Sequence, residues 1–183
     1  MSTIINGSSP SITFSDSTTQ TTAFTGSASQ ITSGTLPSAQ LPTGSVLQVV
    51  QGLTTTQTTS SSTSYADATG FTATITPKFA TSKVLIMVGA NGCFKNSGNT
   101  GSALNLKLQK NGSDLIAWTS LVGTTGSSVQ NYVGSNVLNY LDSPATTSAT
   151  TYKIQLANNV AASFVAINQN SDTSTLTLME IAG

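Results

Sequence analysis

The chain has 183 residues, of which 37% are hydrophobic and only 7% are charged, and six basic residues balance six acidic ones. All the basic residues are lysines, so the chain lacks both the positive surplus and the arginines of a typical nucleic-acid-binding protein. It has no histidine and a single cysteine, Cys93. This excludes Ser-His-Asp and Cys-His nucleophilic sites and an intrachain disulfide.

The first part of the chain, residues 1–30, is predicted to be an extended arm. Its apolar residues come singly among Ser, Thr, Gln and Gly, and no window shows a helical period. Such a segment cannot bury enough surface to offset the entropy cost of ordering it, so it is either disordered or ordered against another chain. Its low charge favours the second alternative. The candidate anchors of this arm are Ile12, Phe14, Phe24 and Ile31.

Residues 31–44 are predicted to be a joint between the arm and a domain. Pro37 and Pro42 each follow a leucine, and proline favours extended geometry in the residue before it.

Residues 45–183 are predicted to form an all-β domain. Short segments of strand character alternate with turn signals, and no segment predicts a helix. Asn91-Gly92 and Asn111-Gly112 are turn signals, and 54–64 reads as a polar loop. This pattern predicts an antiparallel β-sandwich or jelly roll. The expected strands are 46–51, 71–76, 83–90, 104–108, 115–119, 130–141, 152–156, 164–167 and 175–181.

The most apolar of the expected strands is 83–90, and it indicates how the domain is packed. Its uninterrupted apolar run is too short to cross a bilayer, so we expect no membrane insertion. A strand that is apolar on both faces must be covered on both faces. We expect one face to pack on the domain's own core and the other on a second copy, with Leu85 and Ile86 on opposite sides. The run comprises Val84, Leu85, Ile86, Met87 and Val88.

The closing strand supplies a second set of candidate interface or core residues. Leu176, Leu178 and Glu180 share one face of a strand with a two-residue period. If that face meets a threefold axis, three carboxylates converge there. The alternative is that Glu180 is a solvated residue at the end of a strand.

Two parts of the chain resemble known phage proteins. The stretch ITFSDSTTQTTAFTGSASQITSGTLPSAQLPTGSVLQVVQ resembles the amino-terminal halves of bacteriophage tail-fibre and related virion proteins. FTATITPKFATSKVLIMV and TLTLMEIAG resemble fibre-tip domains of jelly-roll type, similar to the tumour-necrosis-factor and C1q fold. The resemblance implies a homotrimer on a phage particle, assembled in the bacterial cytoplasm. It also implies that the arm ties the knob to other virion proteins.

No catalytic site is expected. Each acidic residue reads as a turn or strand-end residue, which gives no support to a pair of catalytic carboxylates. We therefore expect neither enzymatic activity nor a metal or cofactor. The acidic residues are Asp16, Asp67, Asp114, Asp142, Asp172 and Glu180.

Two polar loops, 91–101 and 123–128, are the candidates for contact with a host-surface glycan or protein, because binding residues concentrate on loops over a rigid scaffold. Their candidate contact residues are Asn96, Asn99, Thr124 and Thr125.

The sequence thus favours a non-enzymatic phage virion structural protein, a trimeric fibre or fibre-like appendage involved in host attachment. Two alternatives stay open: a capsid decoration protein that stabilises the head, and a monomeric carbohydrate-binding module.

Overall fold

The computed structural model describes residues 4–5, 12–13, 17, 19–20, 37–122 and 125–183. The chain divides into two compact units, Met1–Gln40 and Leu41–Gly183. Three of the predicted arm anchors, Phe14, Phe24 and Ile31, lie outside the described residues, and so does Thr124.

The described part of the first unit contains three very short strands. They are β1 (Ile4–Ile5), β2 (Ile12–Thr13) and β3 (Thr19–Gln20), and they pair antiparallel in the order β1-β2-β3. The predicted anchor Ile12 lies in β2, and a 3-10 turn, η2 (Ser38–Gln40), follows. The described arm residues therefore pair within the arm itself, which the prediction of an extended segment did not include.

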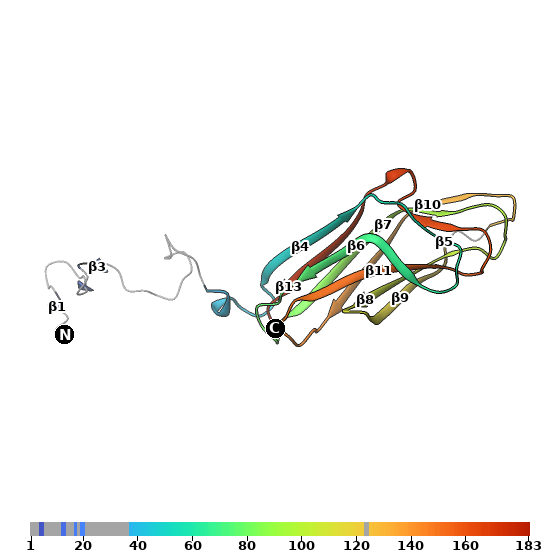
Figure 1. The fold of residues 1–183 in the computed structure, drawn as a ribbon. Coiled ribbons are helices and arrows are strands. Elements are labelled where there is room, and N and C mark those ends of the chain that lie inside the picture. The colour runs from blue at the N-terminus through green and yellow to red at the C-terminus, as the bar shows by residue number, and fades with distance from the viewer. Residues whose placement is uncertain (1–3, 6–11, 14–16, 18, 21–36, 123–124) are drawn as a thin grey trace. The chain divides into compact units, whose positions relative to one another are not determined.

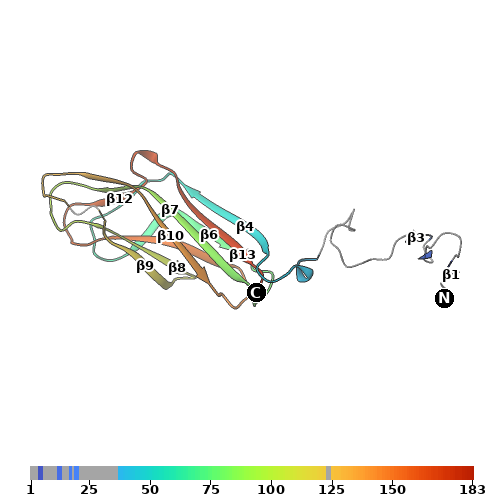
Figure 2. The ribbon, with the colours of Figure 1, turned by 180° about the vertical axis from the view of Figure 1, so that it is seen from behind.

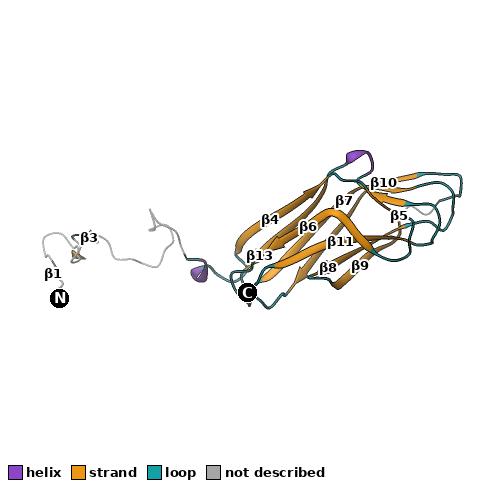
Figure 3. Cartoon of the chain, viewed as in Figure 1, coloured by secondary structure: helices purple, strands orange, loops and turns teal. Residues whose placement is uncertain are grey.

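The second unit is an all-β domain of two antiparallel sheets, which confirms the all-β, antiparallel part of the prediction (Figures 1 and 3). One sheet has six strands in the order β4-β13-β7-β12-β5, with β10 on the other edge of β7. Figure 2 shows β10 beside β7 from behind. The second sheet has four strands in the order β6-β11-β8-β9. A second 3-10 turn, η3 (Gln169–Ser171), precedes the last strand.

The strands of the six-stranded sheet are β4 (Val46–Thr54), β5 (Thr58–Ser60), β7 (Lys83–Lys95), β10 (Asn131–Asp142), β12 (Val165–Ile167) and β13 (Ser174–Ile181). Those of the four-stranded sheet are β6 (Ala66–Ile75), β8 (Leu104–Lys110), β9 (Ser113–Val122) and β11 (Thr150–Asn158).

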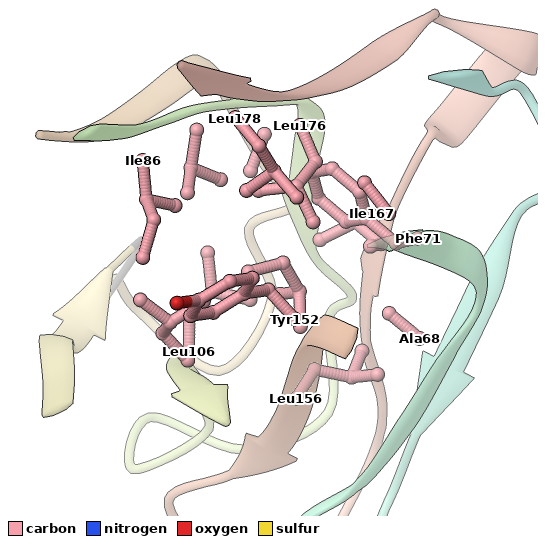
Figure 4. Packing of buried hydrophobic residues seen from close by; sticks show 14 of the residues in the cluster. Ala68, Phe71, Ile86, Leu106, Tyr152, Leu156, Ile167, Leu176 and Leu178 are labelled. Atoms are coloured by element: carbon pink, nitrogen blue, oxygen red, sulfur yellow. The ribbon is translucent and has the colours of Figure 1, made fainter. Parts of the chain in front are cut away.

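The hydrophobic core lies between the two sheets. Ile86 of β7 and Leu176 and Leu178 of β13 lie opposite Leu106 of β8 and Tyr152 of β11 (Figure 4). All five side chains are fully buried. Alternate residues of each strand supply this core, because successive side chains of a strand point to opposite faces. Each such burial contributes about 1.5–3 kcal/mol to folding.

Two details of the predicted strands are wrong. Asn91-Gly92 is not a turn between strands, because β7 continues through it to Lys95. Gly92 has a φ of 58°, and a Cβ there would lie 2.5 Å from the backbone nitrogen of Gln169, so the glycine allows a close approach inside an irregular strand. The predicted polar loop 54–64 contains β5, which pairs with β12.

A buried charged network joins the two sheets. The Lys110 ammonium on β8 lies 3.0 and 2.9 Å from the two carboxylate oxygens of Asp142 on β10. The Tyr152 hydroxyl on β11 donates to the same carboxylate at 2.7 Å. Burial, followed by this contact with Asp142, raises the pKa of Tyr152, so its hydroxyl keeps its proton. The network therefore fixes β10 against β8 and β11.

Glu180 adopts neither of the two predicted arrangements. It shares a face with Leu176 and Leu178, as expected, but that face points into the domain and Glu180 is fully buried. Its carboxylate accepts hydrogen bonds from the Gln48 amide and from the backbone N–H of Lys78, the latter at 2.7 Å. Burial alone would raise the pKa of Glu180, but these hydrogen bonds outweigh it and hold the pKa below its usual value.

The Glu180→Gln variant should be less stable at pH 7 by about 1–3 kcal/mol, because its amide nitrogen would face the donor of Gln48. A lowered pKa in the folded state stabilises the protein above the unfolded pKa, and this contribution is lost as the pH falls below the ordinary glutamate value of 4.5 and through the lowered one. The difference between wild type and variant should therefore shrink over that range. Urea unfolding at several pH values measures this, and a difference independent of pH would contradict the assignment.

Candidate subunit-contact face

The six-stranded sheet has one face on the core and one that points away from it. We call the second, over β4, β13, β7 and β10, the outward face. Residues paired across antiparallel strands lie on the same side of a sheet, so the strand register defines rows across this face. The first row is Val49, Met179, Leu85 and Leu141; the second is Gln51, Thr177, Met87 and Asn139; the third is Leu53, Thr175, Gly89 and Val137.

The outward face exposes apolar side chains on both of its edge strands. Leu53 of β4 is 61% exposed and Val137 of β10 is 69% exposed. Among the side chains that the structure describes, every exposed large hydrophobic residue lies on β4, on β10 or in the loop just before β10. These residues are Val46, Val49, Leu53, Val129, Tyr132, Val137 and Leu141.

This face is also almost free of charge. Among the described residues of its four strands, Lys83 at the start of β7 is the only charged side chain that points outward. Glu180 and Asp142 point inward, on the side of Val84. A sheet face with exposed apolar side chains on both edge strands and so little charge is typical of a contact face rather than of a solvated one.

The opposite sheet gives the contrast. Its outer side has ion pairs between Lys153 and Asp67 at 2.7 Å and between Lys107 and Asp114 at 2.9 Å. The Lys107 ammonium also lies 4.2 Å from the centre of the Tyr65 ring. Both carboxylates receive a further hydrogen bond from a glutamine, and hydrogen bonding together with the lysines lowers the pKa of Asp67 and of Asp114. The outer side of the four-stranded sheet is therefore a charged, solvated surface.

The central strand has the two-sided character that the sequence predicted. Val84, Ile86 and Val88 are buried in the core, whereas Leu85 and Met87 are half-buried on the outward face. The expectation that Leu85 and Ile86 point to opposite sides is confirmed. The chain's own residues therefore cover the second side only in part.

Leu176 and Leu178, predicted as interface or core, belong to the core. The sequence analysis missed Val49 and Met179 on the first row and Val137 on the third. For Val49 the signal was present, because it stands two residues from Leu47 on a strand with period two, whereas Val137 stands two residues from Ser135 and Asn139, which are both polar.

The structure brings the two predicted contact loops together. The backbone N–H of Gly98 donates to the Ser127 carbonyl at 2.5 Å, and the Gln130 amide donates to Asn96 at 3.1 Å. Asn99 accepts a hydrogen bond from the backbone N–H of Gly101, within its own loop.

Thr125, in the second loop, donates to the carbonyl of Val129 at 3.3 Å. Beneath both loops lies a residue that the sequence analysis missed, Lys95, which is fully buried. Its ammonium lies 3.4 Å from the carbonyl oxygens of Asn96 and Gly126, one in each loop. Lys95 therefore ties the loops to the end of β7.

The described residues offer little for covalent or metal chemistry. Cys93 is buried in β7, and burial raises the pKa of its thiol to about 12, so it stays protonated at neutral pH. Within the described ranges, no three His, Cys, Asp or Glu side chains are grouped to hold a metal ion. The helical segments in those ranges are too short or too polar to cross a membrane.

The fold and this face define a β-sandwich-like protein with one uncovered apolar sheet face. No protein-family model matches the chain, and a comparison with curated proteins gives no match.

Proposed function

We propose that this chain is a non-enzymatic structural protein of a bacteriophage virion, with its sandwich domain assembled as a homotrimeric knob. In this proposal it forms a fibre or fibre-like appendage that takes part in attachment to the host surface. The observation that carries the proposal is the outward face. Exposed apolar residues such as Leu53 and Val137 lie on its two edge strands, and Lys83 is the only charged side chain that points outward among the described residues of its four strands.

Two further observations support it. The order β4-β13-β7-β10 opposite β6-β11-β8-β9 is compatible with an eight-stranded jelly roll, the fold that the resemblance implies for the knob. Placed around a common axis, the outward faces of three copies would remove this apolar surface from water, whereas the charged outer side of the other sheet would stay solvated.

The mass of the full chain in solution tests the proposal. A trimer has three times the 18.6 kDa of one chain, and light scattering coupled to gel filtration separates the two. We expect the trimer at micromolar concentration, because burial of apolar sheet faces supports stable subunit contacts. A particle of one chain would contradict the trimeric knob and favour a monomeric binding module.

The position of the chain on the particle tests the second part. A fibre is present in few copies at the tail, whereas a capsid decoration protein covers the head in hundreds. Labelling of virions with an antibody against the sandwich domain distinguishes these arrangements. Labelling of the head would replace the attachment role with capsid stabilisation.

A further inference from the structure

The second row of the outward face has polar side chains at three of its four positions, and it lies between two rows whose edge residues are apolar. Gln51 on β4 and Asn139 on β10 are exposed, and they stand at opposite edges of this second row. The Gln51 amide donates to the Thr177 hydroxyl at 2.8 Å, so the glutamine side chain is held in place on the sheet.

We propose that Gln51 of one copy meets Asn139 of the next, and that this polar contact fixes the register of the copies in the assembly. The inference rests on the proposed trimer. In a cyclic assembly, one surface of each subunit meets a different surface of its neighbour. Here β4 and β13 form one half of the outward face, and β7 and β10 form the other half.

When the strands of neighbouring copies run in parallel at the same height, each row of one copy faces the same row of the next copy. On the first row, Val49 of one half meets Leu141 of the other. On the third row, Leu53 meets Val137. On the second row, Gln51 and Asn139 meet.

A glutamine amide has both donors and an acceptor, so Gln51 can serve Thr177 and a neighbouring Asn139 at the same time. If the strands were tilted against the threefold axis, the ring would still close, but the contact would shift by a row and place Gln51 against Leu141 or Val137. That shift would bury an amide without a partner, which costs about 1–3 kcal/mol for each group. The polar row therefore selects one register out of several that the apolar rows alone would permit.

Disulfide trapping in the full-length chain tests the contact. The Gln51→Cys/Asn139→Cys variant is assembled under reducing conditions, then oxidised mildly and run on a non-reducing denaturing gel. We expect a covalent product of three chains, because each copy contributes one cysteine to each of two contacts. The single variants, Gln51→Cys and Asn139→Cys, should give no linked product, because Cys93 is fully buried. Gln51→Cys paired with Val137→Cys, one row away, is the matched control and should link at least tenfold less.

The possible outcomes separate the two levels of the proposal. A wild-type chain that runs as a monomer overturns the trimer and the contact together. A wild-type trimer in which 51 and 137 link but 51 and 139 do not overturns the register and leaves the trimer in place. A largest product of two chains, from a wild type that runs as a dimer, shows a twofold arrangement and overturns the threefold one.

A charge exchange gives a second, independent measurement. Gln51→Lys alone and Asn139→Asp alone should each lower the trimer fraction at fixed concentration at least tenfold. The double variant places opposite charges at the same contact and should recover most of the wild-type trimer. A double variant no better than the product of the two single effects would overturn the contact.

Discussion

The Ile86→Asp variant is expected not to fold. Ile86 is fully buried between the sheets, where it lies among apolar side chains of β8, β11 and β13. A carboxylate at this position would be buried without a partner, and the loss of the isoleucine adds a packing cost, for a total above about 4 kcal/mol. Circular dichroism and gel filtration should show unfolded or aggregated protein.

Leu85→Asp is the matched control, one residue away on the same strand. Leu85 points to the outward face and is half-buried, so the aspartate can reach water in the single chain. We expect this variant to keep the β-sheet spectrum of the wild type and to run as one chain, because three carboxylates would otherwise be brought into the subunit contact. A folded trimer of Leu85→Asp would show that the outward face does not lie between the copies.

Lys110→Met should lower the unfolding free energy by about 3 kcal/mol, because it leaves the buried Asp142 carboxylate without its cation. Asp142 is 8% exposed at its side chain and keeps only the hydrogen bond from Tyr152 among the contacts of this network. Urea unfolding at pH 7 gives the value.

The exposed ion pair on the outer side of the other sheet provides the comparison. In that pair, Asp67 is 55% exposed at its side chain, so water already solvates the carboxylate. Lys153→Met should therefore cost less than about 1 kcal/mol. If Lys110→Met and Lys153→Met lowered the unfolding free energy equally, the ion pair between the sheets would contribute no more to stability than the exposed one.

Much of the fold could be predicted from local patterns. The alternation in 71–76 and 104–108 and the unbroken apolar run around Ile86 predict strands, because side chains on a strand alternate between two faces. The structure contains strands over these residues in β6, β8 and β7. The continuation of β7 through Gly92 could not be predicted, because it depends on a close approach to Gln169 from a distant part of the chain.

The candidate contact face could be predicted from the sequence only in part. The sequence predicted that Leu85 and Ile86 lie on opposite sides, but it did not connect Leu85 with Val49, Met179 and Leu141, which the strand register places in one row. The buried position of Glu180 could not be predicted from the sequence either. Its hydrogen bonds come from Gln48, 132 residues away, and from the backbone of Lys78, 102 residues away.

Local patterns in the amino-acid sequence are enough to predict an all-β, antiparallel domain, the two-sided character of the strand around Ile86 and the absence of a histidine-based site. These follow from composition and from the two-residue period of a strand, both of which are local properties. Only the tertiary structure decided which apolar side chains share the uncovered face and which charges are buried. Strand pairing decides both, because it joins residues far apart in the chain and no local pattern specifies the partner.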